Sequence, residues 1–246
     1  MTKPNGFVFY RGPSMLDGKP IVAILTGIAH NSANDKTGAL LQTWILREDV
    51  NPLDAVNSGD DVSICGDCKH RGVVVDGKNK GRSCYVRLDT APNNIWKTYK
   101  RGRYPHVTMN VMLELLEGRK VRGGSYGDPA AVPYSVWCMM GEQIKTAYTH
   151  QWRKFPELAL FCMASVDTSE ERAQAKLLGF RTFRVRGEDE AKEEYEVNCP
   201  MTKEMGYKAR CVDCMACGGQ QAKAKADITI IVHGNGKAKH FMEAVS

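Results

Sequence analysis

Four cysteines near the C-terminus have the residue type and spacing of a thiolate metal site. Cys199 precedes a proline, and Cys211, Cys214 and Cys217 follow with two residues between successive cysteines. Thiolates are soft ligands that select zinc or an iron–sulfur centre. Zinc ribbons usually pair two Cys-x2-Cys knuckles, whereas a Cys-x2-Cys-x2-Cys run with a Cys-Pro is similar to bacterial ferredoxins, although here the Cys-Pro comes first. The pattern predicts a cysteine-rich metal loop over residues 195–220 that holds iron–sulfur or zinc.

A second cysteine group lies within residues 61–90. Cys65 and Cys68 form a Cys-x2-Cys half-site, and Cys84 follows 16 residues after Cys68. His70 could complete a structural zinc site with these three thiolates. Alternatively, three thiolates leave one position on the metal open, which is the arrangement that a catalytic centre needs. Sequence spacing leaves both alternatives open.

Three residues that can transfer protons stand at the ends of expected strands. Asp128, His150 and Asp167 each follow a short apolar or alternating segment. In parallel α/β folds, the carboxyl ends of the strands carry the active site. We therefore expect these three residues to position a substrate or to move protons. The alternative is that they are polar because loops are polar, with Asp167 belonging only to the cap of the next helix.

Glycines and aromatic residues near these positions suggest a cofactor or nucleotide pocket. Gly124 and Gly127 lie in a glycine-rich turn, where the missing side chain permits close approach to a phosphate or cofactor. Tyr148 and Trp152 flank His150, a combination that fits stacking and hydrogen bonding to a base. A plain turn and a core tryptophan beside a structural histidine are the alternatives.

The balance of charge permits nucleic-acid binding. Lysine and arginine outnumber aspartate and glutamate by 34 − 28 = 6, a mildly basic excess. One segment interleaves aromatic and basic residues, as expected for stacking on bases and pairing with phosphates. Its members are Trp96, Lys97, Tyr99, Lys100, Arg101 and Arg103. A solvated basic helix end is the alternative.

Segments of strand and helix character alternate along the chain. Expected strands cover 20–26, 40–46, 61–64, 83–88, 120–126, 146–149, 158–165, 181–186 and 228–233; expected helices cover 92–101, 108–117, 134–144 and 169–178. Such alternation favours a parallel α/β fold. We expect a complete or partial parallel β/α barrel with a C-terminal cysteine-rich metal-binding loop, and an open doubly wound sheet as the alternative. One domain over 1–246 is expected, with residues 1–19 as an N-terminal arm.

Composition excludes several classes of protein. Of the 246 residues, 43% are hydrophobic and 25% are charged, so a core can form. No apolar run approaches the roughly 20 residues of a membrane helix, and no apolar leader is visible. We expect a cytoplasmic protein whose cysteines bind metal instead of forming disulfides. The remaining cysteines, Cys138 and Cys162, are expected to be buried as small hydrophobic residues.

The order of the motifs resembles an uncharacterised family found in phages and plasmids, and more loosely the phage proteins of the gene product 88 type. The motifs are Lys36-Thr-Gly38, Gln42-Thr-Trp44-Ile-Leu46, Cys65-Gly-Asp-Cys68, Ser83-Cys84-Tyr85-Val86, Tyr126-Gly-Asp128-Pro, Tyr148-Thr-His150-Gln-Trp152, Ala164-Ser165-Val166-Asp167 and the four C-terminal cysteines. They span about residues 20–235. The resemblance implies a phage or mobile-element setting, in the host cytoplasm, and carries no assigned activity.

The layout also resembles radical SAM enzymes more distantly. Those enzymes are α/β barrels in which three cysteines hold a cluster, and some carry a second cluster in a C-terminal extension. The usual Cys-x3-Cys-x2-Cys spacing is absent, because 15 residues separate Cys68 from Cys84. The resemblance implies an iron–sulfur cofactor and binding of S-adenosylmethionine.

Two functions follow from these observations. The first is an iron–sulfur enzyme that acts on a nucleic acid or a nucleotide. The second is a non-catalytic nucleic-acid-binding protein of phage replication or host takeover, in which zinc only stabilises the loops and binding weakens steeply with salt.

Overall fold

An apolar run at residues 21–25 forms an inner strand of a mixed five-stranded sheet. Across this sheet the strands are β1 (Gly6–Pro13), β2 (Pro20–Thr26), β3 (Leu41–Arg47), β6 (Val121–Tyr126) and β7 (Ile144–Thr146). The computed structural model describes residues 4–31, 34–233 and 237–245. Strand β2 pairs antiparallel with β1 and β3, whereas β3, β6 and β7 run parallel. Residues 21–25 are fully buried because both faces of β2 are covered.

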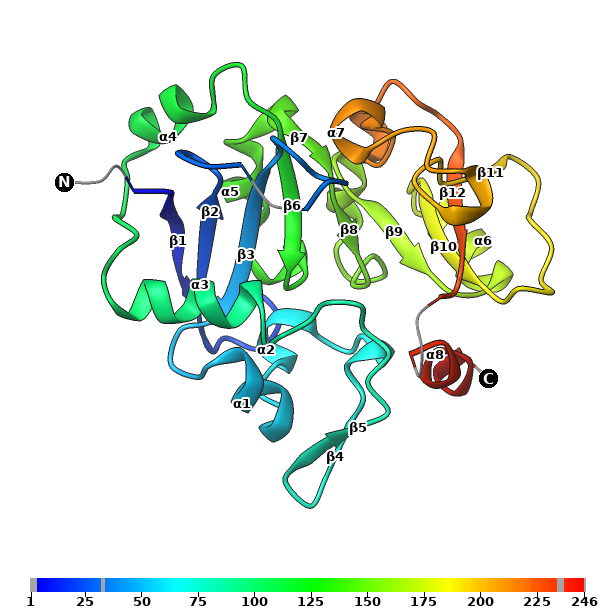
Figure 1. The fold of residues 1–246 in the computed structure, drawn as a ribbon, viewed down its shortest axis with the longest axis horizontal. Coiled ribbons are helices and arrows are strands. Elements are labelled where there is room, and N and C mark those ends of the chain that lie inside the picture. Colours follow the sequence, from blue (N-terminus) through cyan, green and yellow to red (C-terminus); the bar gives the residue numbers. More distant parts are fainter. Residues whose placement is uncertain (1–3, 32–33, 234–236, 246) are drawn as a thin grey trace.

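A second five-stranded sheet is parallel throughout. Its order is β11 (Glu196–Asn198), β12 (Asp227–Ile231), β10 (Thr182–Arg186), β9 (Met163–Val166) and β8 (Tyr148–Thr149). Only Ala147 separates β7 from β8, so one stretch of chain contributes to both sheets, which lie side by side (Figure 1). The expected α/β architecture with parallel segments is confirmed. A complete barrel is not formed, because no pairing among the described strands joins β1 to β11.

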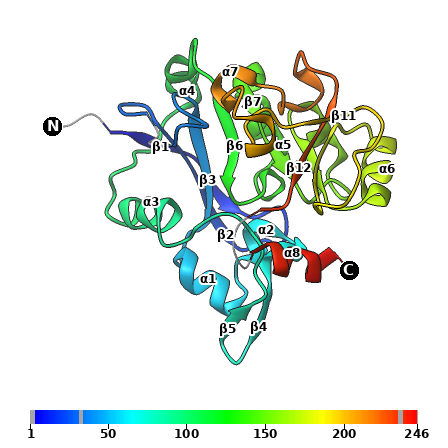
Figure 2. The same cartoon turned by 45° about the vertical axis from the view of Figure 1, so that its right-hand side comes forward.

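Helices and turns cover the sheets and connect the strands (Figures 1 and 2). The helices are α1 (Pro52–Ser58), α2 (Val62–Cys65), α3 (Ala91–Lys100), α4 (Met109–Leu116), α5 (Tyr134–Cys138), α6 (Ser169–Leu177), α7 (Cys211–Cys214) and α8 (Lys237–Val245). Short 3-10 turns span Lys69–Arg71, Pro129–Ala131, Gly141–Gln143, Pro156–Leu160, Lys203–Met205 and Gly219–Gln221. A hairpin of β4 (Val73–Val75) and β5 (Lys78–Lys80) projects beyond α1 (Figure 1). No helix in the described ranges is long and apolar enough to cross a membrane.

Local signals explain where several of these elements begin and end. The Thr168 side chain accepts a hydrogen bond from the Glu171 amide at 3.1 Å and so caps the start of α6. Asn51 caps α1 in the same way, and Gly59 ends it with a φ of 85°, a conformation that favours glycine. These caps satisfy amides and carbonyls that a helix end would otherwise leave unpaired.

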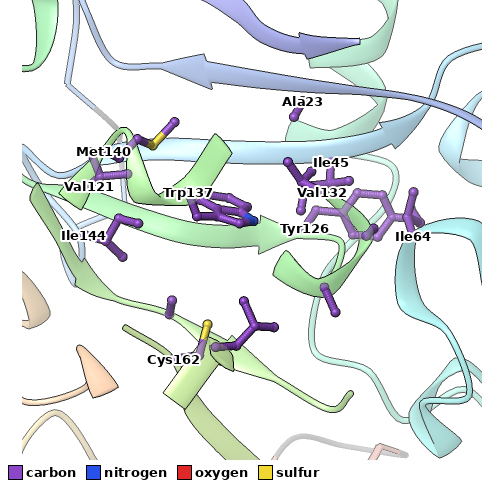
Figure 3. Close-up of a cluster of buried hydrophobic side chains, with 14 of the residues drawn as sticks. Ala23, Ile45, Ile64, Val121, Tyr126, Val132, Trp137, Met140, Ile144 and Cys162 are labelled. Carbon is purple, nitrogen blue, oxygen red and sulfur yellow. The ribbon is translucent and has the colours of Figure 1, made fainter. Parts of the chain in front are cut away.

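The core fills the space between the first sheet and α5. Trp137 is fully buried, and its indole Nε1 donates to the Pro129 carbonyl oxygen at 2.9 Å. Figure 3 shows the ring among the side chains of Val121, Met140 and Ile144. Burying one side chain of this kind stabilises the fold by about 1.5–3 kcal/mol. The same close-up shows Cys162, which is fully buried as expected.

Several elements differ from the expectations. Residues 6–13, expected within an N-terminal arm, form β1, because Phe7 and Val8 are buried against the core. The segment 61–64 is part of the short helix α2 and not a strand, since the Cys65 amide donates to the Asp61 carbonyl oxygen. The helix expected over 134–144 ends at Cys138, and the thiol of that residue is exposed instead of buried.

Candidate functional site

A cavity of about 250 Å³ lies where β6, β8 and β9 end. Its wall contains all three cysteines of the first group and all three residues expected to be catalytic, namely Cys65, Cys68, Cys84, Asp128, His150 and Asp167. Parallel strands bring their carboxyl ends to one edge, so residues far apart in sequence meet there. The structure therefore places the expected proton-transfer residues beside the first cysteine group.

The first cysteine group is held by a helix and two loops. Cys65 ends α2, and Gly66 turns the chain toward Cys68 with a φ of 60°. A Cβ on Gly66 would lie 2.5 Å from the side chain of Gln151, so the close packing requires glycine. The amide of Cys84 donates to the His70 carbonyl oxygen at 3.1 Å, which fixes the second loop against the first.

Burial controls the protonation of these thiols. It raises the pKa of Cys68 to about 12. Burial also raises the pKa of Cys65 well above its usual range, and the charges of Asp61 and the two neighbouring cysteines act in the same direction. Buried thiols of this kind stay protonated at neutral pH unless a cation is bound, because a coordinated metal deprotonates its thiol ligands.

His70 uses both of its ring nitrogens inside the protein. Nδ1 lies 2.7 Å from Ser83 Oγ, and Nε2 lies 2.9 Å from Asp167 Oδ2. The ring also stacks on Phe241 of α8 at 5.3 Å. A histidine needs a free ring nitrogen to bind a metal. His70 would have to break one of these hydrogen bonds to become the fourth ligand, which counts against the Cys3His alternative.

The carboxylate of Asp128 is committed to positioning the chain. It accepts hydrogen bonds from Thr149 Oγ1 at 2.8 Å, from the His150 amide at 2.7 Å and from the Ala130 amide at 3.0 Å. Burial raises the pKa of Asp128, and the charge of His150 and the hydrogen bonds oppose the shift. Asp128 thus ties the end of β8 to the turn after β6.

The ring of His150 is the side chain in this group that is most available for chemistry. It borders the cavity and also a second hollow of about 230 Å³ beyond Asp167. Its centroid lies 5.5 Å from that of His70, edge to face. Within the ranges that the structure describes, the His150 ring makes no hydrogen bond. Both nitrogens can therefore serve a bound molecule.

Asp167 is buried and ionised. Burial pushes its pKa upward, but the hydrogen bond from His70 and the charges of His70, His150 and Lys69 outweigh that effect, so the pKa lies below its usual range. Lys69 Nζ stands 3.2 Å from Asp167 Oδ2. Asp167 Oδ1 is buried without a hydrogen-bond partner among the described residues. A buried acceptor of this kind is costly unless a ligand or water satisfies it.

The expected cofactor residues divide into two sets. Gly124, Gly127 and Tyr148 line the cavity, whereas Trp152 does not. Trp152 is buried, and its Nε1 donates to the Ser165 carbonyl oxygen at 3.2 Å. The core-tryptophan alternative therefore fits Trp152. A Cβ on Gly127 would lie 2.6 Å from the Cβ of Ile45, so packing alone already requires glycine there.

The second cysteine group lies around α7, at the opposite end of the sheets from α2 (Figures 1 and 2). Cys199, Cys211, Cys214 and Cys217 line one hollow of about 20 Å³. The loop is anchored because the Arg181 guanidinium donates to carbonyl oxygens of Ala216 and Gly219 at 2.8 and 3.0 Å. Burial raises the pKa of Cys217 to about 12, although the neighbouring hydroxyl of Tyr148 opposes the shift.

Neither cysteine group is arranged around a single point. In the described parts of the chain, no three His, Cys, Asp or Glu residues converge closely enough to hold one metal ion. The expected metal loop over 195–220 therefore has its four cysteines side by side without a preformed single-ion site.

The segment expected to bind nucleic acid forms α3 and the turn after it. Its aromatic residues are engaged in packing: Trp96 Nε1 donates to the Arg47 carbonyl oxygen at 3.1 Å, and the Tyr99 hydroxyl donates to Glu48 at 3.0 Å. The basic residues of the segment, Lys97, Lys100, Arg101 and Arg103, are exposed. This arrangement fits the solvated basic helix end, and nucleic-acid binding by the segment stays a prediction.

Sequence reasoning missed two contributions to the site, both from α8. Phe241 of α8 covers the cavity, and Lys237 Nζ donates to the Cys84 carbonyl oxygen. The amphipathic character of residues 237–245 was the available signal. Comparison with models of protein families, with curated proteins and with solved structures finds no match for this chain.

Proposed function

We propose that this protein is an iron–sulfur enzyme. Cys65, Cys68 and Cys84 would hold a cluster whose remaining position faces the cavity. The four C-terminal cysteines would hold a second, auxiliary cluster. The observation that carries the proposal is the convergence of three cysteines on one cavity where His70, the available fourth ligand, is hydrogen-bonded at both nitrogens.

The donor set fits a cluster. In a four-iron, four-sulfide cluster each cysteine binds a different iron atom, so the thiolates need not converge on one metal ion. Among the described residues, neither cysteine group forms a single-ion site. Hydrogen bonds and burial around the sulfurs then set the potential. When bound, such a cluster would supply one electron, and its open iron would supply a site for a ligand.

The chain's own residues would prepare the site for that chemistry. Asp128 fixes the backbone of His150, which leaves the His150 ring free to accept or donate a proton. Asp167 and Ser83 hold His70 in one orientation beside it. Phe241 stacks on His70 and adds an apolar side chain to the wall of the cavity.

The distant resemblance to radical SAM enzymes supports a finer version of the proposal. The two sheets would act together as a partial β/α barrel, with the first cluster at the carboxyl ends of its strands. S-adenosylmethionine would bind near Gly124 and Tyr148, which line the cavity. The substrate would be a nucleic acid or a nucleotide, and the setting a phage or mobile element in the host cytoplasm.

The alternative function is a zinc-stabilised protein that binds nucleic acid without chemistry. The exposed basic residues of α3 favour it. The hydrogen bonds of His70 count against a Cys3His zinc site at the first cysteine group.

Cysteine variants prepared without oxygen test the proposal. Cys84→Ala should lose the iron of the first cluster and the activity while keeping the second cluster. Cys214→Ala should lose the iron of the second cluster while keeping the first cluster. Cys138→Ala, whose thiol is exposed and lies in neither group, is the matched control and should keep all the iron. Iron and sulfide are measured per chain. Loss of both clusters from Cys84→Ala would contradict separate roles for the two cysteine groups. Zinc in place of iron in the wild-type protein would contradict the proposal.

A further inference from the structure

A wide groove of about 630 Å³ continues the cysteine cavity toward the opposite end of the strands. Tyr85, Tyr148 and Phe183 belong to the walls of both hollows, so the groove and the cavity adjoin each other. Volumes of roughly 300–1,000 Å³ are typical of sites for small ligands. The groove is thus large enough for a substrate that the cysteine cavity alone would not hold.

The groove is positively charged. Among the described residues that line it, Lys36, Arg87, Arg122 and His233 are basic, and none is acidic. The cysteine cavity, in contrast, contains Asp128 and Asp167. A wall with one sign of charge focuses the field on ligands of the opposite sign.

Arg122 is the most informative of these groups. Its Nε is buried and has no hydrogen-bond partner, and no ion pair to its guanidinium is formed within the described ranges. Four other arginines also have a buried Nε without a described hydrogen-bond partner, but their terminal nitrogens donate hydrogen bonds within the protein; these are Arg71, Arg172, Arg181 and Arg186. Arg184 pairs with Glu196 at 2.7 Å. A buried guanidinium N–H without an acceptor is destabilising, and an oxyanion such as phosphate would satisfy it.

Aromatic rings stand beside these charges. Trp44, Tyr85, Tyr148 and Phe183 line the groove. Trp44 is held in place because its Nε1 donates to Thr26 Oγ1 at 2.8 Å, and its ring is only partly buried. Rings beside cations are the combination that binds a flat base together with a phosphate.

We propose that this groove binds the phosphate and base of a nucleotide unit, with Arg122 and Lys36 on the phosphate. The groove then directs the nucleotide toward the cysteine cavity. The role of this nucleotide as the substrate rests on the proposed function, whereas its binding in the groove does not. The nucleotide unit is either free or part of a single strand, since both offer the same chemistry. The experiment below compares this site with the segment of α3 and the turn after it, the surface that the sequence predicts for nucleic-acid binding.

Arg122 and Lys36 could have a role other than phosphate binding, and the experiment has to distinguish the two roles. The charges of Arg122 and Lys36 also act on the thiol of Cys211 and lower its pKa, against the effect of burial. They could therefore serve only to neutralise the second cysteine group. In that role, replacing them would change metal content and leave nucleotide affinity unchanged.

Calorimetric titration of the whole protein distinguishes these roles. The ligands are adenosine 5′-monophosphate, adenosine, inorganic phosphate and a single-stranded decanucleotide. The proteins are wild type, Arg122→Gln and Lys36→Gln, with Lys78→Gln on the exposed hairpin as the charge-matched control. Arg101→Gln tests α3 in the same assay. Each is titrated with and without its metal, and iron is counted separately.

We expect Arg122→Gln and Lys36→Gln to weaken binding of the monophosphate at least tenfold, and Lys78→Gln and Arg101→Gln to leave it unchanged. Adenosine should bind more weakly than its monophosphate. A decanucleotide that binds tenfold more tightly than the monophosphate identifies a strand as the source; equal affinity identifies the free nucleotide.

Three results would overturn the inference. These are unchanged monophosphate affinity in both groove variants, equal binding of adenosine and its monophosphate, and loss of affinity in Arg101→Gln alone. Lys36 is exposed, so its variant keeps the test valid where Arg122→Gln fails to fold. A protein that binds nucleotide but contains no iron would contradict the proposed enzyme and support the nucleotide-binding groove. A protein that contains iron but binds no nucleotide would support the proposed enzyme and contradict the nucleotide-binding groove.

Discussion

Asp128 and His150 lie next to each other in the site but have different roles. Asp128 is buried and accepts three hydrogen bonds, two of them from backbone amides. His150 is only partly buried, and its ring borders two hollows. The sequence predicted both as catalytic because both follow strands. Hydrogen-bond partners, which the sequence does not reveal, distinguish Asp128, which fixes the backbone, from His150, whose ring makes no described hydrogen bond.

This division predicts different stabilities for two variants. Asp128→Ala leaves buried donors unpaired and should lower the free energy of unfolding by about 3 kcal/mol. His150→Ala removes no described hydrogen bond of the ring and should change it by less than about 1 kcal/mol. Urea unfolding at neutral pH measures both. Equal losses in the two variants would show that the His150 ring is structural.

At the scale of elements, a buried ion pair fixes the strand that leads to the second cysteine group. Arg184 of β10 is fully buried and binds Glu196 of β11 through Nε at 2.8 Å and Nη2 at 2.7 Å. Cys199 follows directly after β11. Removing one partner of a buried pair is strongly destabilising, because the other charge stays buried alone.

The pair predicts how stability depends on pH. Burial, the largest single influence, would raise the pKa of Glu196, but the hydrogen bonds from Arg184 and the Glu193 amide and the charges of Arg184 and Arg172 together outweigh it and lower the pKa below the ordinary 4.5. The stabilisation is therefore complete above pH 4.5 and is lost as the pH falls through the lower, folded-state value. Glu196→Gln should lower the free energy of unfolding at pH 7 by about 3 kcal/mol and flatten this acid loss.

Glu48→Gln is the matched control, because Glu48 pairs with the exposed Arg11. Its effect on unfolding at pH 7 should stay below about 1 kcal/mol. Unfolding by urea from pH 3 to pH 7 measures both variants. An acid loss in Glu196→Gln that is as steep as in wild type would contradict the assignment to this pair.

Sequence patterns predicted the elements whose signals are local. The apolar runs of β2 and β10 and the capped, glycine-terminated α6 lie within a few residues of their expected bounds. Short elements such as α2 depend on tertiary contacts, because four residues do not form a stable helix alone. Strand β1 depends on pairing with β2, which flanking prolines and glycines concealed in the sequence.

For the whole molecule, the sequence predicted that polar residues after the strands would lie at one edge of the fold, because parallel strands align their carboxyl ends. The structure brings Asp128, His150 and Asp167 together with the first cysteine group, whereas the second group lines a separate hollow. The sequence could not decide the role of His70 or the closure of the barrel. The first depends on contacts with Ser83 and Asp167, and the second on strand pairing across the entire sheet. The groove was also hidden, because Lys36, Arg122 and His233 come from separate parts of the chain.

The most direct test of the central claim is metal analysis of the wild-type protein purified without oxygen. Iron, acid-labile sulfide and zinc are measured per chain and compared with the absorption spectrum. We predict a brown protein with iron and sulfide in near-equal amounts and no stoichiometric zinc. A colourless protein with one zinc ion in each cysteine group and no sulfide would contradict the account and favour the zinc-stabilised binding protein.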